Sequence, residues 1–268
     1  MKTGFKDLDE IFNIAEPKLI LLTGKNNHFI SMLSGDIANN ICLNQEHKVL
    51  EIIDLHKEYL IKRIVVNNAN VNYNKWTLKN EYEEEKYTNK ELEQIGLAMM
   101  NLIETTKELP TIIERKDIGF NLKKIKKFIL NYANWYADRD EIETLVVLDI
   151  SPFNYGIIKS KWKKEYLKSI EKFKSFIGDS NYEFCRYQEA KKFIKNVRKI
   201  VKQLRCPIMI VCEEGFLFSK IRKYADTIIN VDFVEEHSNI VEIKVEEENR
   251  VKTCKLNYDG GIRKFESI

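Results

Sequence analysis

Four short runs of mostly apolar residues, spread along the whole chain, limit the folds that this sequence can adopt. They are Leu19–Leu22, Val49–Ile53, Leu145–Leu148 and Ile208–Val211. Each is too short for a core helix and is followed by small or polar residues, as is typical of a buried strand. Segments with helical periodicity lie between them, such as Ser31–Leu43 and Leu122–Tyr136. Strands that alternate with helices predict an α/β fold, in which these four strands are neighbours in a largely parallel sheet with helices on both faces.

The remaining segments extend this pattern without a break. Strands are predicted at Thr111–Glu114 and Thr227–Val231, and helices at Glu58–Val66, Leu92–Thr106 and Glu189–Leu204. The last two predicted strands, Asn239–Val245 and Lys252–Asn257, are expected to pair as a C-terminal antiparallel hairpin. No repeat and no Pro/Ser-rich linker interrupts the series, so residues 1–268 are interpreted as a single domain.

Composition excludes several classes of protein. A hydrophobic fraction of 44% suffices for a sizeable core, while 44 Lys and Arg against 41 Asp and Glu neither favour nor exclude nucleic acid. Five cysteines without a C-x-x-C pair indicate buried thiols in a reducing cytosol, and the four histidines lack metal-ligand spacing, so no metal site is predicted. There is no signal region and no apolar run of the ~20 residues that a membrane span needs. We therefore expect a soluble, cytoplasmic protein without a membrane partner.

The order of several segments resembles one family. Thr3–Asp9 reads T-G-F-K-D-L-D, Leu109–Ile113 reads L-P-T-I-I, Leu145–Asp149 reads L-V-V-L-D and Tyr224–Ile228 reads Y-A-D-T-I. With three further segments, in the same order and at nearly the same spacing, they resemble the C-terminal motor domain of DnaB-type replicative DNA helicases. The resemblance implies a RecA-like P-loop NTPase fold. The resemblance does not extend to the family's N-terminal domain, which contacts primase.

The resemblance places a phosphate loop at residues 24–31. A working loop reads G-x-x-x-x-G-K-[ST]; its backbone N–H groups hold phosphate, its Lys neutralises charge and its hydroxyl holds Mg²⁺. Here it reads Gly24-Lys25-Asn26-Asn27-His28-Phe29-Ile30-Ser31, so Phe replaces the second Gly and Ile replaces the Lys. The candidate nucleotide-binding residues that survive are Gly24, Lys25, Asn26, Asn27 and Ser31. Two interpretations stay open: a compact anion-binding turn, because Asn tolerates the left-handed conformation, or a loop that preserves only the fold.

Two acids occupy the inherited catalytic positions. Asp149 matches the acid that supports Mg²⁺, although an acid at a strand end also serves as a turn former or helix cap. Asp54 matches the family's catalytic Glu but is one methylene shorter, and capping the following helix is the alternative role. Val245 and Glu247 stand where the family has a K-x-R pair that reaches the neighbouring subunit's ATP, and Glu213 adds a further acid. These replacements remove the cations on which phosphoryl transfer depends.

A basic and aromatic segment follows Asp149. Its candidate nucleic-acid residues are Lys159, Lys161, Trp162, Lys163 and Lys164. Cations interleaved with aromatics suit single-stranded DNA, through phosphate contacts and base stacking. The alternative is an amphipathic helix whose aromatic side faces the core. The family's second DNA loop is shortened here to Ser219–Lys223.

Two functions remain for this chain. The first is a non-hydrolysing helicase paralogue that acts as a binding or scaffolding module in DNA replication or related DNA transactions, with itself, a replicative helicase or single-stranded DNA as the partner. The second is a slow or unconventional ATPase or helicase that uses Lys25, Asp54 and Asp149, with ATP and Mg²⁺ bound weakly.

Overall fold

A computed structural model describes most of the chain. The described residues are 1–14, 17–45, 47–53, 57–73, 75, 87–104, 109–114, 122–137, 144–149, 179–235, 238–248 and 250–268. Statements below concern these residues.

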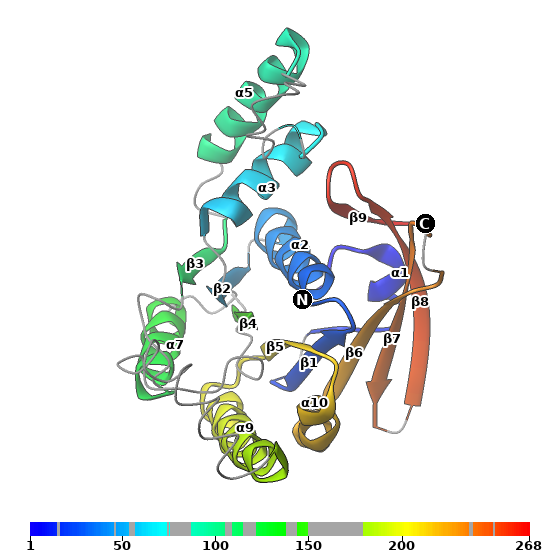
Figure 1. Ribbon diagram of the computed structural model, residues 1–268. Coiled ribbons are helices and arrows are strands. Elements are labelled where there is room, and N and C mark those ends of the chain that lie inside the picture. Colours follow the sequence, from blue (N-terminus) through cyan, green and yellow to red (C-terminus); the bar gives the residue numbers. More distant parts are fainter. Residues whose placement is uncertain are drawn as a thin grey trace.

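One nine-stranded sheet organises the fold (Figure 1). Its strands are β1 (Leu19–Gly24), β2 (Lys48–Ile53), β3 (Thr111–Glu114), β4 (Thr144–Asp149), β5 (Ile208–Glu213), β6 (Thr227–Phe233), β7 (Ile240–Glu247), β8 (Arg250–Asp259) and β9 (Lys264–Ser267). The spatial order is β3-β2-β4-β5-β1-β6-β7-β8-β9, parallel from β3 to β6 and antiparallel from β6 to β9. The four strands expected at the centre are neighbours, and the expected hairpin is β7–β8, so both predictions are confirmed.

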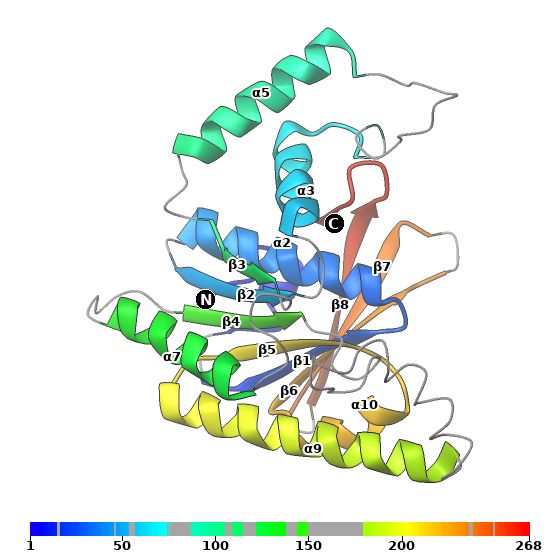
Figure 2. The same cartoon turned by 60° about the vertical axis from the view of Figure 1, so that its left-hand side comes forward.

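Helices cover both faces of the parallel part (Figures 1 and 2). Helix α2 (Asn27–Gln45) packs on one face against β1, β2, β4 and β5. Helices α7 (Leu122–Ala137) and α9 (Asp179–Leu204) lie on the other and contact each other, and the short α10 (Phe216–Ile221) packs on α9. The alternating side chains of each strand feed two separate apolar clusters, one under α2 and one under α7 and α9.

A pair of helices extends this layered core. Helix α3 (Lys57–Ala69) packs against α5 (Asn89–Glu104), and the two share a small apolar cluster of their own with Ile64, Ile95 and Leu102. Figure 2 shows α5 on the outer side of α3, at the end of the molecule away from α9.

The T-G-F-K-D-L-D segment has a clear structural role. Asp9, in the short helix α1 (Lys6–Asp9), accepts hydrogen bonds from the backbone N–H and hydroxyl of Thr3 at 2.5 and 2.7 Å. Gly4 has a positive φ of 84°, and a Cβ there would lie 2.5 Å from the Asn40 side chain of α2. The segment is therefore a side-chain-closed turn that fixes the N-terminus to α2, and it needs glycine at its centre.

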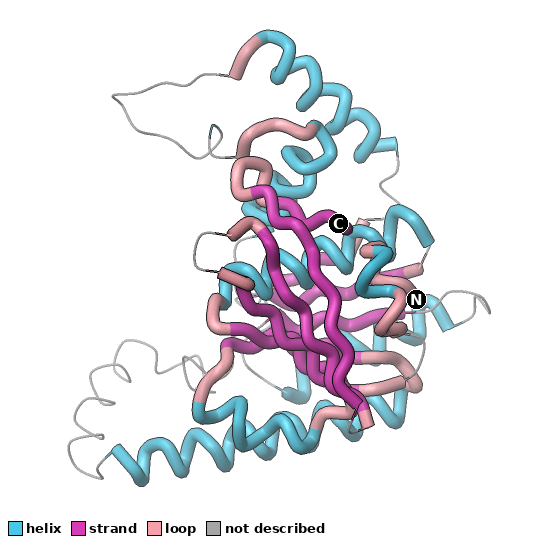
Figure 3. The backbone as a smooth tube through the Cα atoms, turned by 90° about the vertical axis from the view of Figure 1, so that its right-hand side faces the viewer, coloured by secondary structure: helices cyan, strands magenta, loops and turns pink. Residues whose placement is uncertain are grey.

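Several elements differ from the sequence prediction, among them α1, α10 and the 3-10 turn Arg222–Tyr224, none of which was predicted. Helix α2 begins at Asn27 rather than near Ser31, and α9 begins at Asp179 rather than at Glu189. Strand β9 was not predicted, because four residues carry too little periodicity; it completes the antiparallel ladder by pairing with β8, as Figure 3 shows.

The cysteines and the helices bear on the expectations from composition. Cys42, Cys206 and Cys212 are buried and form no disulfide, and burial raises the pKa of Cys212 to about 12. Among the described helices, none is long and apolar enough to span a membrane.

Candidate functional site

The candidate site is the junction between β1 and α2, at the carboxyl end of the parallel strands, where α/β folds place ligands. Only Lys25 and Asn26 separate the strand from the helix. The Asn26 side chain accepts a hydrogen bond from the N–H of Phe29 at 3.3 Å, and its carbonyl accepts one from the N–H of Ile30, also at 3.3 Å. Asn26 is therefore the N-cap of α2, and backbone donors that a phosphate loop would aim at phosphate are used within the helix.

No residue of this junction has the left-handed backbone that a compact anion-binding turn would need. Gly4 is the one glycine with positive φ among the described residues, and neither Asn26 nor Asn27 is among the non-glycine residues with positive φ. Asn27 is instead the first residue of α2. The compact anion-binding turn, one of the two interpretations that the sequence left open, has no counterpart in the backbone of this segment.

The two residues that replace the phosphate-loop Gly and Lys pack inward. The ring of Phe29 lies 4.5 Å, centroid to centroid, from the rings of both Phe233 and Tyr258, and 6.3 Å from that of Phe265. Ile30 is fully buried in the cluster under α2. These contacts bind the start of α2 to β6, β8 and β9, so apolar packing of the C-terminal strands stabilises the early start of the helix.

Gly24 fits tightly into this packing. A Cβ at this position would lie 2.4 Å from the carbonyl oxygen of Val231 and 3.0 Å from Cγ2 of Ile30. The surviving glycine thus permits close approach of β6 and of the Ile30 side chain.

Lys25 is the one cation between β1 and α2. Its side chain is 79% exposed, and its Nζ lies 3.8 Å from Oδ1 of Asp232, at the end of β6. At that exposure and distance the ion pair is weak and the side chain is directed to solvent.

Ser31 and Asp149, the two residues expected to support Mg²⁺, lie together. The Ser31 hydroxyl donates a hydrogen bond to Oδ1 of Asp149 at 3.1 Å, and both residues are buried. The structure therefore brings together one candidate from the loop and one from the end of β4. Within the described part of the chain, no group of three or more His, Cys, Asp and Glu side chains could hold a metal ion.

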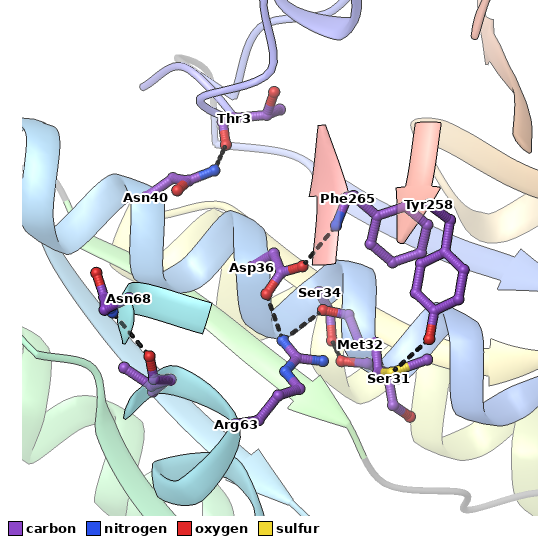
Figure 4. A network of polar contacts seen from close by, with 11 residues as sticks. Thr3, Ser31, Met32, Ser34, Asp36, Asn40, Arg63, Asn68, Tyr258 and Phe265 are labelled. Carbon is purple, nitrogen blue, oxygen red and sulfur yellow. Dashed lines mark hydrogen bonds and ion pairs between the residues drawn. The ribbon is translucent and has the colours of Figure 1, made fainter. Parts of the chain in front are cut away.

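A buried polar network lies beside this pair (Figure 4). Nη2 of Arg63, on α3, donates to Oδ1 of Asp36 at 2.5 Å and to the carbonyl oxygen of Met32 at 2.8 Å, both on α2. The other Asp36 oxygen accepts the N–H of Phe265 at 3.4 Å. Burial raises the pKa of the Asp36 carboxyl, and the adjacent guanidinium opposes that rise. The network joins α2, α3 and β9 through one buried ion pair.

Sequence reasoning missed Glu51 as well as the Asp36–Arg63 pair. Glu51 lies in the middle of β2 on the α2 side of the sheet and is buried. Burial, with repulsion from Asp149, raises the pKa of Glu51 to about 8, although the Arg63 charge opposes the rise. The side chain is therefore uncharged at neutral pH. The available signal was an acid inside an otherwise apolar strand.

The positions matched to the family's K-x-R pair have other roles. Val245 is buried in the core, and Glu247 accepts a hydrogen bond from Lys18 at 2.7 Å and from Thr227 at 3.0 Å. Burial raises the pKa of Glu247, but these hydrogen bonds outweigh it and hold the pKa below its ordinary value. Glu247 thus ties β7 to β1 and β6 of the same chain. Glu213 ends β5 in register with Gly24 and is exposed.

The remaining sequence candidates lie outside the described residues. They are Asp54 and the nucleic-acid candidates Lys159, Lys161, Trp162, Lys163 and Lys164.

Comparison with known proteins gives the fold. The chain matches no known family by sequence, and no curated protein is significantly similar to it. Among solved structures it is similar to an ATPase domain, with a TM-score of 0.72 and 14% identity over 99% of this chain and 90% of that one. It is also similar to a DnaB-like replicative helicase described with its interactions with primase, with a TM-score of 0.70 and 13% identity over 99% of this chain and 61% of that one. The chain therefore has the helicase-like RecA fold of DnaB-type motor domains, and it spans about three fifths of the second structure.

Proposed function

We propose that this protein is a helicase-like RecA-fold binding module that does not hydrolyse ATP at the β1–α2 junction. The observation that carries the proposal is the start of α2 at Asn27, with Ile30 buried where a phosphate-loop lysine would stand. The likeness to a replicative helicase structure supplies the context of DNA replication, in which such a module would act in the cytoplasm.

A bound triphosphate with Mg²⁺ does not fit the residues present. The N–H groups of Phe29 and Ile30 already donate to Asn26, and Arg63, the one cation among the buried residues described, is already paired with Asp36. The nearby carboxylate of Asp149 would repel the phosphates unless a metal ion neutralised it. Since phosphoryl transfer depends on electrostatic stabilisation, these losses together predict negligible turnover.

An exposed apolar surface on α5 supports a role in binding another protein. Its members share helix α5 and have exposed fractions between 46% and 65%: Leu92, Leu97, Met99, Met100 and Ile103. We call this set the α5 apolar surface. Large contiguous apolar patches on a protein surface mark sites of interaction with other molecules. The candidate partners are a second copy of this chain and a replicative helicase; single-stranded DNA stays a separate prediction.

Calorimetric titration with a non-hydrolysable ATP analogue, with and without Mg²⁺, tests the nucleotide part of the proposal. We expect no binding tighter than millimolar and no steady phosphate release from ATP. A micromolar dissociation constant, or phosphate release abolished by Asp149→Asn, would instead favour the slow ATPase that uses Lys25, Asp54 and Asp149.

Light scattering after size exclusion tests the binding part. If the α5 apolar surface is an interface between copies, Met99→Glu with Met100→Glu should reduce the apparent mass to that of one chain. Glu10→Lys, at an exposed position outside α5, is the control and should leave the mass unchanged. A monomeric wild type that also fails to bind a replicative helicase would contradict the assembly role.

A further inference from the structure

The outer side of helices α7 and α9 carries a strongly basic surface. Its described members are exposed and lie on two neighbouring helices: Lys124 and Lys127 on α7, and Lys192, Lys195, Lys199 and Lys202 on α9. We call this set the α7–α9 basic surface. It is separate from the β1–α2 junction, because α2 covers the opposite face of the sheet (Figure 2).

The lysines of α9 form one straight row. Their spacing of three, four and three residues places them within a narrow sector of the helix, opposite the buried residues Ile194, Val197 and Val201. At 1.5 Å per residue the row from Lys192 to Lys202 is about 15 Å long. The row therefore points away from the sheet over its whole length.

The stretches that carry these lysines contain no acidic residue, and the three acids of α9, Asp179, Glu183 and Glu189, all precede Lys192. The sequence has no Asp or Glu between 190 and 212, nor between 118 and 137. Arg198 is engaged elsewhere, since it donates to Asp226 at 2.7 Å, so it is not counted in the surface. Because the whole chain has a formal net charge of only +3, the remainder of the chain is net negative. The six lysines of this surface thus exceed the net charge of the whole chain.

We propose that the α7–α9 basic surface binds the phosphate backbone of duplex DNA without sequence preference. The four lysines of the row can neutralise roughly four phosphates, since a duplex carries about one negative charge per 1.7 Å of its axis when both strands are counted. Because α7 and α9 are in contact, Lys124 and Lys127 add two further cations beside this row.

Other partners fit this surface less well. Single strands are held largely by stacking on aromatic side chains, and Phe128, at 43%, is the one exposed aromatic among the described side chains of the two helices. A protein partner or a membrane would need apolar side chains between the charges. The most exposed positions of the α9 row are instead lysines. The phosphate backbone requires only cations.

Fluorescence anisotropy with the full chain and a labelled 20-base-pair duplex tests the proposal. Four phosphate contacts predict that affinity falls about 100-fold between 50 and 200 mM salt. The variant Lys192→Glu/Lys195→Glu/Lys199→Glu should lose at least 100-fold in affinity at 50 mM salt. Changing the same three lysines to Gln should reduce the slope of log affinity against log salt concentration. The reduction should correspond to the loss of about three phosphate contacts.

A matched control separates this surface from net charge. Lys6→Glu/Lys90→Glu/Lys255→Glu makes the same change in charge at exposed positions on other elements and should lose less than about fivefold. All variants should keep the circular dichroism spectrum and melting temperature of the wild type. Equal losses for the two triple variants, tighter binding of a 20-nucleotide single strand than of the duplex, or displacement of the duplex by equimolar polyglutamate would each overturn the proposal. None of these measurements involves ATP, so their results are independent of whether the β1–α2 junction binds nucleotide.

Discussion

Replacing Glu51 by Gln should stabilise the protein in a pH-dependent way. Its pKa of about 8 in the folded protein compares with an ordinary value of 4.5. Between these pH values the unfolded chain releases the Glu51 proton while the folded protein keeps it. The free energy of unfolding therefore falls as pH rises from about 4.5 to about 8, and below 4.5 the group has no effect. Gln cannot ionise, so the variant escapes this loss.

The size of this change in the free energy of unfolding follows from how far pH 7 lies above the ordinary pKa of Glu51. At 1.36 kcal/mol per unit, the unfolded chain gains about 3 kcal/mol at pH 7 by releasing this proton. Glu51→Gln should therefore be more stable than the wild type by up to about 3 kcal/mol at pH 7, and equal to it within about 0.5 kcal/mol at pH 4.5.

Urea denaturation at pH 4.5, 5.5, 6.5 and 7.5 measures this difference. Glu93→Gln, at an exposed position, is the matched control and should leave stability unchanged at every pH. A gain for Glu51→Gln that is the same at all four pH values would refute the reasoning, as would a loss of stability at pH 7.5.

Three further substitutions test the packing around the site. Arg63→Met should lower the free energy of unfolding by about 3–5 kcal/mol in urea denaturation, because a buried carboxylate loses its partner, and adding Asp36→Leu should restore most of it; no recovery would contradict the ion pair. Phe29→Ala should cost about 2–4 kcal/mol by the same assay, and a cost under 1 kcal/mol would show that the ring does not pack inward. Gly24→Ala should lower the melting temperature by several degrees, whereas Gly96→Ala, which has open space around it, should leave it unchanged or raise it; equal effects would contradict the tight packing.

The strand pattern of the sequence predicted the centre of the fold. Leu19–Leu22 and Leu145–Leu148 are buried strands because an unbroken apolar run of that length fits only a strand covered on both faces. The start of α2 was mispredicted, since aligning residues 24–31 with a phosphate loop assumed a loop up to Ser31. The local signals favoured a helix: Asn26 is a good N-cap, and Ile30 and Leu33 already have helical spacing.

The buried network could not be predicted, because its members come from distant segments. Asp36 and Arg63 lie 27 positions apart in the sequence, and the Ser31–Asp149 hydrogen bond joins residues 118 positions apart. Nothing in the local pattern around Glu51 reveals that these groups share one buried region; only the parallel order β2-β4-β5-β1, with α2 packed across it, brings them together.

Amide hydrogen exchange at residues 27–31, with and without 5 mM Mg-ATP, tests the central claim most directly. If this segment is the first part of α2, the amides of Phe29, Ile30 and Ser31 are protected without nucleotide, and Mg-ATP leaves their exchange rates unchanged. Rapid exchange that slows by tenfold or more on adding Mg-ATP would show a loop that closes around phosphate, and would contradict the account.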